Sequence, residues 1–223
     1  MIKFLDESMC RQLRELFHTL DQQVTILFFG SPQQNCSYCQ DTIALLQEVE
    51  ELSSKVILQV HNLDEEPELR KTHQVEMTPC VIIGKNAGGH FVDSRIRFYG
   101  IPAGHLFNAL IRSIQMVSTG KTELRDETMA FLRELNSPLH FQVFVTPYCP
   151  HCPKAVQMVH QLALENEMVR SEMIETREFQ EFADANQVKG VPHTVINHGA
   201  GHVTGALSEL QFLDRLKLYL QAN

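Results

Sequence analysis

The chain has 223 residues and a formal net charge of −8, with 43% hydrophobic and 21% charged residues. This composition is typical of a globular protein and excludes a disordered or fibrous one. The negative charge disfavours nucleic-acid binding, because counterion release on binding requires Lys and Arg side chains at the phosphates. The length is sufficient for two domains of about 110 residues, each able to bury a core.

The N-terminal segment shows no targeting signal. The residues MIKFLDESMC lack an apolar h-region, and no later segment approaches the roughly 18 consecutive apolar residues that a membrane-spanning helix needs. We therefore expect a cytoplasmic protein with no membrane contact. In a reducing compartment, paired cysteines are typical of catalytic or metal sites rather than of permanent crosslinks.

The first half predicts a βαβ unit followed by two antiparallel strands and a helix. Hydrophobic spacing indicates each element, and the pair Cys36 and Cys39 lies between the first strand and its helix. The short Gly-Gly-His segment suits a hairpin between the last two strands. In chain order, the predicted elements are a helix at 13–20, a strand at 24–29, a helix at 43–49, a strand at 55–60, a helix at 64–73, a hairpin at 80–100 and a helix at 106–117.

The second half repeats this order. It predicts a helix at 124–135, a strand at 141–145, the pair Cys149 and Cys152, a helix, a strand at 168–174, a further helix, a strand at 194–197, a Gly-rich turn and a final helix from residue 208. Cys36 and Pro79 are 43 residues apart, as are Cys149 and Pro192, so the two halves match at an offset of 113. Two landmarks in register indicate a duplication.

The order β-α-β followed by β-β-α, with a cysteine pair after the first strand, is that of thioredoxin. We predict an α/β fold of two tandem thioredoxin-like domains, each a central mixed sheet flanked by helices. The predicted domains are 1–118, with the CSYC site, and 119–223, with the CPHC site.

The CPHC segment predicts a reactive dithiol. If Cys149 caps the following helix, Pro150 takes the first helical position, where its missing N–H costs nothing. Free N–H groups and the helix dipole then lower the pKa of Cys149 from its ordinary value of about 8.5. His151 adds a positive charge when protonated, which makes the disulfide a better oxidant. Cys152 is the resolving thiol, and we expect Cys36 and Cys39 to form a more reducing pair.

The prolines at 79 and 192 predict a client-binding backbone. In a thioredoxin fold, a cis X-Pro bond beside the dithiol exposes the preceding residue so that a substrate peptide pairs with it as an added strand. Those residues are Thr78 and Val191 here. A trans proline at a strand start is the alternative. The equal spacing from two cysteine pairs favours the cis form for Pro79 and Pro192.

The chain resembles the protein disulfide oxidoreductases built from two fused thioredoxin- or glutaredoxin-like units, which are similar to protein disulfide isomerase. The resemblance covers essentially the whole length and rests on TPYCPHCPKAVQMVHQLA, on NCSYCQDTIALLQEVEELSSK, and on the segments EMTPCVIIG and KGVPHTVIN. The N-terminal part of the alkyl hydroperoxide reductase flavoprotein has a similar fold, but keeps the cysteines of one site only.

The resemblance implies thiol–disulfide oxidase, reductase and isomerase activity on protein thiols and disulfides. It also implies a dominant role for Cys149 and Cys152, and electrons from a thioredoxin-reductase-like flavoenzyme. A peroxiredoxin is a further candidate partner. No cofactor and no metal are expected.

Two departures from the thioredoxin pattern leave questions open. The chain has no Trp, and the strands before the two pairs hold no Asp or Glu, so the sequence shows no proton acceptor for Cys39 or Cys152. A metal or iron–sulfur carrier is an alternative function, with Cys80 and His193 as third ligands. A noncatalytic adaptor is another. More than a hundred residues between the pairs disfavours a shared metal.

Overall fold

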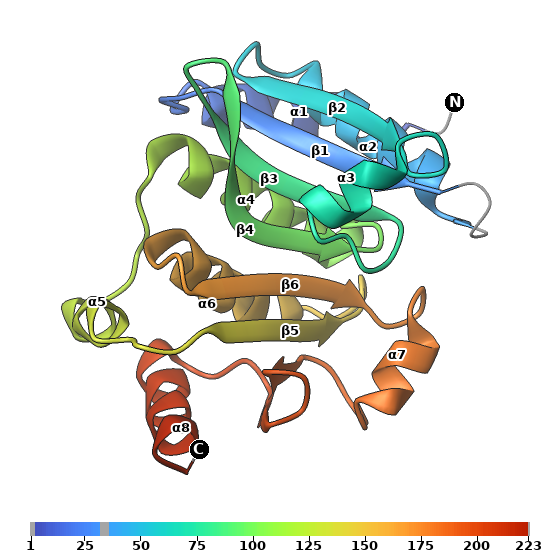
Figure 1. The fold of residues 1–223 in the computed structure, drawn as a ribbon. Coiled ribbons are helices and arrows are strands. Elements are labelled where there is room, and N and C mark those ends of the chain that lie inside the picture. Colours follow the sequence, from blue (N-terminus) through green and yellow to red (C-terminus); the bar gives the residue numbers. More distant parts are fainter. Residues whose placement is uncertain (1–2, 32–35, 223) are drawn as a thin grey trace. The chain divides into compact units, whose positions relative to one another are not determined.

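A computed structural model describes residues 3–31 and 36–222, which form two compact units (Figure 1). The first unit lies within Met1–Ile101 and Ile114–Gly120, and the second within Pro102–Ser113 and Lys121–Asn223. Residues 102–113, expected in the first domain, are thus grouped with the second unit. The domain limits 1–118 and 119–223 stay a prediction.

The first unit is a four-stranded mixed sheet with the order β2-β1-β3-β4. β1 and β2 are parallel, whereas β3 runs antiparallel to both β1 and β4. Its elements are α1 (Glu7–Phe17), β1 (Val24–Gly30), α2 (Cys39–Glu50), β2 (Val56–Asn62), α3 (Pro67–Thr72), β3 (Cys80–Ala87) and β4 (His90–Tyr99). A 3₁₀ turn, η2 (Gly104–Leu106), and α4 (Phe107–Thr119) follow in the chain.

Local sequence signals explain where several elements begin and lie. Asp6 caps α1 by accepting a hydrogen bond from the Met9 N–H at 2.8 Å. Every residue of β1 is buried, as expected of a strand with a neighbour on each side. Pro67 opens α3, where its missing N–H needs no partner.

The second unit repeats the arrangement, with the strand order β6-β5-β7-β8. β5 and β6 are parallel, and β7 runs antiparallel to β5 and β8. The elements are α5 (Asp126–Arg133), β5 (Leu139–Val145), α6 (Cys152–Glu165), β6 (Val169–Glu175), α7 (Gln180–Ala185), β7 (His193–Ile196), β8 (Gly201–Thr204) and α8 (Glu209–Ala222). The predicted fold class of two thioredoxin-like domains with mixed sheets is therefore confirmed.

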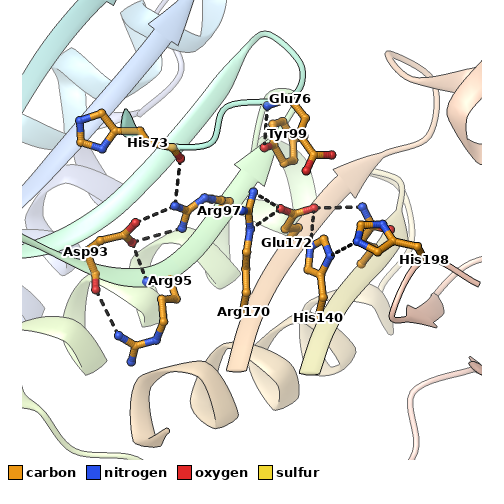
Figure 2. A network of polar contacts seen from close by, with 11 residues as sticks. His73, Glu76, Asp93, Arg95, Arg97, Tyr99, His140, Arg170, Glu172 and His198 are labelled. Atoms are coloured by element: carbon orange, nitrogen blue, oxygen red, sulfur yellow. Dashed lines mark hydrogen bonds and ion pairs between the residues drawn. The ribbon is translucent and has the colours of Figure 1, made fainter. Parts of the chain in front are cut away.

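Each sheet also buries a charged cluster (Figure 2). In the first unit, Arg97 is 3% exposed and pairs with Asp93 at 2.6 Å. In the second unit, Glu172 is fully buried and pairs with Arg170 at 2.6 Å and His140 at 3.0 Å. Burial alone raises the pKa of Glu172, but these partners and Gln142 outweigh it and lower the pKa to about 2. The carboxylate is thus held in its charged form.

Within residues 3–31 and 36–222, no helix combines the length and the apolar character that crossing a membrane requires.

Candidate functional site

Both CxxC pairs are closed as disulfides. Cys36 is bonded to Cys39, and Cys149 to Cys152, with a Cα–Cα distance of 5.4 Å in each pair. Each pair follows the buried first strand of its unit and reaches into the first residue of the next helix. The pairing predicted within each CxxC motif therefore matches the structure.

The predicted start of the helix after the second pair is wrong. Cys149 does not cap it and Pro150 does not open it, because α6 begins at Cys152 with His151 as its N-cap residue. Residues before Cys152 instead form a turn, in which the Cys149 N–H donates to the Thr146 carbonyl at 3.1 Å. Pro153 lies in the first turn of α6, where its lack of an N–H breaks no helical bond.

The Cys149 sulfur nevertheless receives a donor from the helix. The Cys152 N–H lies 3.1 Å from Cys149 Sγ. Such a donor stabilises a thiolate over a thiol. Cys149 is half-buried and Cys152 is fully buried, so Cys149 is the more accessible residue of the pair.

Both predicted proline bonds are cis, Thr78–Pro79 and Val191–Pro192. The Cys149 Sγ lies 4.0 Å from the Val191 carbonyl oxygen, so this sulfur and the backbone segment before Pro192 are neighbours. Val191 is partly exposed and Pro192 is buried. The roles of Thr78, Pro79, Val191 and Pro192 in client binding stay predictions.

Two histidines follow the second proline. His193 is 9% exposed, and its Nε2 lies 2.9 Å from Nδ1 of His202. Burial, and then the neighbouring His202, lower the pKa of His193. The two ring nitrogens lie within hydrogen-bonding distance, as expected for a packed neighbour of the site.

Tyr148 directly precedes Cys149 and has a charged neighbour that no sequence pattern indicated. This side chain is 73% exposed, and the Arg177 guanidinium lies 5.5 Å from the centre of its ring. Next to it, a cavity of about 540 Å³ adjoins Val191. The lining residues are Thr176, Arg177, Gln180, Ala183, Asp184, Val188, Gly190 and Val191. The cavity thus borders the backbone that lies against Cys149.

The loop before Cys149 is held by η2. The His105 N–H donates to the Pro147 carbonyl at 2.9 Å. Gly104 has a φ of +58°, and a Cβ there would lie 2.7 Å from the same oxygen. A glycine is therefore required at this close approach. This contact is one that sequence reasoning missed.

The first pair has a different setting. α2 begins at Cys39 and has Tyr38 as its N-cap residue, with no proline in its first turn. Cys36 is half-buried and Cys39 is 7% exposed. A Cβ on Gly30 would lie 2.9 Å from Cys39 Sγ, so the end of β1 faces this sulfur.

Glu175 is a buried carboxyl group at the end of β6. It is 2% exposed, and its Oε2 accepts the Glu178 N–H at 2.7 Å. Its Oε1 is buried and has no hydrogen-bond partner. Burial raises the pKa of Glu175, and the charge of Arg177 opposes this shift. The strands before the pairs hold no acid, whereas Glu175 lies at the end of the strand that follows, where no sequence pattern singled it out.

Metal ligation is not evident in the part of the chain that the structure describes. There, no three His, Cys, Asp or Glu side chains gather in a way that could hold a metal ion. Cys80, the proposed third ligand of the first pair, is buried in β3.

Several known proteins share this architecture. The thioredoxin domain family model matches residues 139–217. The crystal structure of a protein disulfide oxidoreductase from Aeropyrum pernix K1 has 30% identity and a TM-score of 0.85, covering 97% of this chain and 94% of that one. The NTD_N/C domain of alkylhydroperoxide reductase AhpF from Enterococcus faecalis has 26% identity and a TM-score of 0.84, covering 94% and 98%.

The curated relatives are longer proteins. An NADH dehydrogenase of Bacillus subtilis is 22% identical over 203 residues, which is 90% of this chain and 36% of that protein. The chain spans about a third of the length of the curated relatives it matches.

The fold and the two CxxC disulfides define a thioredoxin-fold protein with two dithiol sites. With 30% identity across nearly all of both chains, the protein belongs to the same group of thioredoxin-fold oxidoreductases as the Aeropyrum pernix enzyme.

Proposed function

We propose that the protein exchanges thiols and disulfides with client proteins, chiefly through Cys149 and Cys152. The observation that carries this proposal is the placement of the partly open Cys149 sulfur 4.0 Å from the Val191 carbonyl, with Cys152 buried behind it. A client strand that pairs with Val191 brings its own disulfide to Cys149. The cavity next to Val191 accommodates a neighbouring client side chain.

In the reducing direction, the Cys149 thiolate attacks one sulfur of a client disulfide. The client S–S bond breaks, one client thiolate leaves, and a mixed disulfide joins Cys149 to the client. Cys152 then loses its proton and attacks Cys149 Sγ. The second client thiolate leaves, and the protein holds the Cys149–Cys152 disulfide. Two electrons pass to the client, and a dithiol donor restores the starting state.

His151 and the first pair have supporting roles in this proposal. His151 is exposed beside the dithiol, where its protonated form favours the Cys149 thiolate. Cys36 and Cys39 form a second exchange site, with Thr78 and Pro79 as its client-binding segment. A thioredoxin-reductase-like flavoenzyme is the proposed electron source.

Insulin reduction by dithiothreitol tests the main proposal. We expect Cys149→Ser to lower the catalysed rate more than tenfold, because the attacking thiolate is lost, whereas Cys36→Ser lowers it less than twofold. The two substitutions are matched, since each removes the partly exposed cysteine of its own pair. Equal losses in the two variants would contradict the dominance of the second pair, and no turnover by the parent protein would contradict the proposal itself.

A second candidate function is electron transfer to a peroxiredoxin. The similarity to a domain of alkylhydroperoxide reductase supports it. The reduced protein is expected to convert the disulfide of a purified peroxiredoxin to thiols, measured as peroxide consumption with this protein as the only donor. Cys149→Ser provides the control, and peroxide consumption that does not depend on Cys149 would contradict this function.

A further inference from the structure

The second site holds a positive charge beside the residue that precedes Cys149. The Arg177 guanidinium lies 5.5 Å from the centre of the Tyr148 ring, and Tyr148 directly precedes Cys149 in the chain. A guanidinium over an aromatic face is attracted by the electrons of the ring, so Tyr148 helps to hold this charge in place. Both side chains are exposed, and an arginine stays protonated at every physiological pH.

The same guanidinium borders the backbone segment that is proposed to bind clients. Arg177 and Val191 both line the cavity of about 540 Å³, and the Val191 carbonyl oxygen lies 4.0 Å from Cys149 Sγ. The cavity volume lies within the range of roughly 300 to 1,000 Å³ that is common for ligand pockets. A client strand that pairs with Val191 therefore brings the side chains that flank its cysteine to this cavity.

The positive charge is available to a client carboxylate. None of the ion pairs within residues 3–31 and 36–222 involves Arg177. A guanidinium can bind a carboxylate through two parallel hydrogen bonds, which is a strong and specific contact. Asp184 of α7 lines the same cavity and is exposed, so it supplies an opposing charge. The contact with Tyr148 places the positive charge on the side of the dithiol.

The first unit has the opposite charge at the matching place. The Leu63 N–H donates to the carbonyl of the last residue of β1, and the Thr176 N–H donates to that of the last residue of β5, each at 2.9 Å. The residues that follow, Asp64 and Arg177, are therefore structural counterparts. Asp64 is partly exposed, and its carboxylate accepts a hydrogen bond from the Ser31 hydroxyl at 2.6 Å.

We infer that Arg177 selects clients that carry an acidic side chain next to the reacting cysteine, an assignment that rests on the proposed function. The client carboxylate enters the cavity beside Val191 and pairs with the guanidinium while the client sulfur approaches Cys149. Tyr148 positions the guanidinium for this contact. The first pair, with Asp64 at the matching place, does not share the preference. Charge complementarity of this kind raises the rate of productive encounter and disfavours clients of the wrong charge.

Three short peptides with blocked ends test the inference. They differ only in the two residues that flank their single cysteine, which are both Glu, both Gln or both Lys, and the cysteine carries a neutral pyridyl disulfide. The Cys149 thiolate attacks the cysteine sulfur of the peptide and forms a mixed disulfide. The bond to the pyridyl sulfur breaks, and the leaving group takes up a proton as thiopyridone. Thiopyridone absorbance gives the second-order rate constant.

The protein is the full chain with Cys10, Cys36 and Cys39 replaced by Ser and the second pair reduced. We expect the Glu peptide to react about tenfold faster than the Lys peptide at low salt, with the Gln peptide between them. Added salt is expected to lower this ratio, because it screens exposed charges. A variant that changes the general reactivity of Cys149 alters both rates equally, so the ratio reports selection alone.

Substitutions of Arg177 separate its charge from its shape. Arg177→Gln is expected to bring the ratio within twofold of one, and Arg177→Glu to invert it. Arg177→Lys keeps the charge but loses the planar contact with the ring, so its ratio falls between those of the parent and Arg177→Gln. Tyr148→Phe keeps the ring and the ratio, whereas Tyr148→Ala lowers the ratio.

Two further proteins serve as matched controls. Lys189 is exposed and lies between two lining residues without lining the cavity itself, so Lys189→Gln is expected to keep the ratio within twofold of the parent. The first pair is measured in the full chain with Cys10, Cys149 and Cys152 replaced by Ser. We expect its ratio to be one or less.

A ratio in Arg177→Gln that stays within twofold of a tenfold parent ratio would overturn the inference, as would a parent ratio near one. An equal loss in Lys189→Gln, or the same preference in the first pair, would also overturn it. In each case, reaction of the parent with the Gln peptide still upholds exchange at Cys149. A parent that reacts with no peptide faster than Cys149→Ser does would overturn the proposed function itself.

Discussion

The two halves of the molecule share a framework but differ in the polar groups they bury. In the second unit, His160, Glu172 and Glu175 are all at most 2% exposed. At the offset of 113, the first unit has Gln47, Gln59 and Asn62 at these places. Gln47 and Gln59 are exposed and Asn62 is partly exposed. Three ionisable groups thus stand where the other half has amides.

The comparison shows which buried groups are present in only one of the two units. Both units form the same strand order and the same cis prolines, so the framework forms in the first unit without an ionisable group at these three places. Burying an ionisable group costs stability unless its partners compensate. We therefore expect the two units to respond differently to pH.

The largest expected effect concerns His160. Burial lowers its pKa to about 3, and its Nδ1 lies 3.0 Å from the Ser113 hydroxyl. Because the unfolded chain binds a proton near pH 6.5 and the folded one does not, stability is lost as pH falls from about 6.5 towards 3. Between pH 6.5 and 4.5, we expect the free energy of unfolding to fall by about 2 to 3 kcal/mol less in His160→Phe than in the parent protein. Urea unfolding at both pH values measures this.

The Ser113 hydroxyl keeps its bond to the Ala109 carbonyl in this variant. The chosen range also lies above the range in which Glu172, with a pKa of about 2, takes up its proton in the folded state. Gln47→Phe, the equivalent change in the first unit, is the matched control. An unchanged pH dependence in His160→Phe would show that His160 does not set the acid sensitivity.

A smaller effect is expected from exchanging the residues between the cysteines. Replacing Ser37 and Tyr38 with Pro and His, in a chain whose second pair is changed to Ser, adds a positive charge beside Cys36. We expect the potential of the first pair to rise by about 30 mV, a roughly tenfold shift in its equilibrium with glutathione. The converse change at Pro150 and His151 is expected to lower the potential of the second pair. If neither pair changed its reduction potential, groups other than the two residues between the cysteines would set the potentials.

The smallest expected effect is on stability and involves Glu175. Burial raises the pKa of Glu175 in the folded state, so the favourable contribution of Glu175 to the free energy of unfolding is fully present below its ordinary pKa. This contribution is lost as pH rises through the pKa of the folded state. The oxidised parent is therefore expected to lose stability relative to oxidised Glu175→Gln between pH 4.5 and 8. Paired unfolding curves measure the difference, and Glu181→Gln should show none. If the parent instead gained stability relative to Glu175→Gln as pH rises, Glu175 would be ionised in its buried position.

The duplication, the strand order and the placement of both cysteine pairs could be predicted because repeated spacing and hydrophobic periodicity are local properties of the sequence. The same holds for the cis bonds at Pro79 and Pro192, for which spacing from the cysteines was the signal. The start of α6 could not be placed from the sequence. The turn before it is held by a hydrogen bond from the Cys149 N–H to the Thr146 carbonyl, and this backbone contact does not depend on side-chain type.

The rest of the second site depends on contacts between distant segments. Glu175 reads as an ordinary acid at a strand end, and only packing shows that its side chain is buried. An alignment of the halves offers a weak signal, since it sets Glu175 opposite Asn62 at the end of the equivalent strand. The support of Pro147 by His105 joins residues far apart in sequence and leaves no local pattern.

The close approach at Gly30 has a practical consequence for engineering. The Cys39 sulfur occupies the space that a side chain on Gly30 would need, whereas Val145, at the matching strand end, carries a branched side chain. A tetrapeptide grafted from one half to the other therefore enters a differently shaped recess. Chimeric proteins meant to transplant the behaviour of the second site should exchange the strand ends together with the cysteine motif.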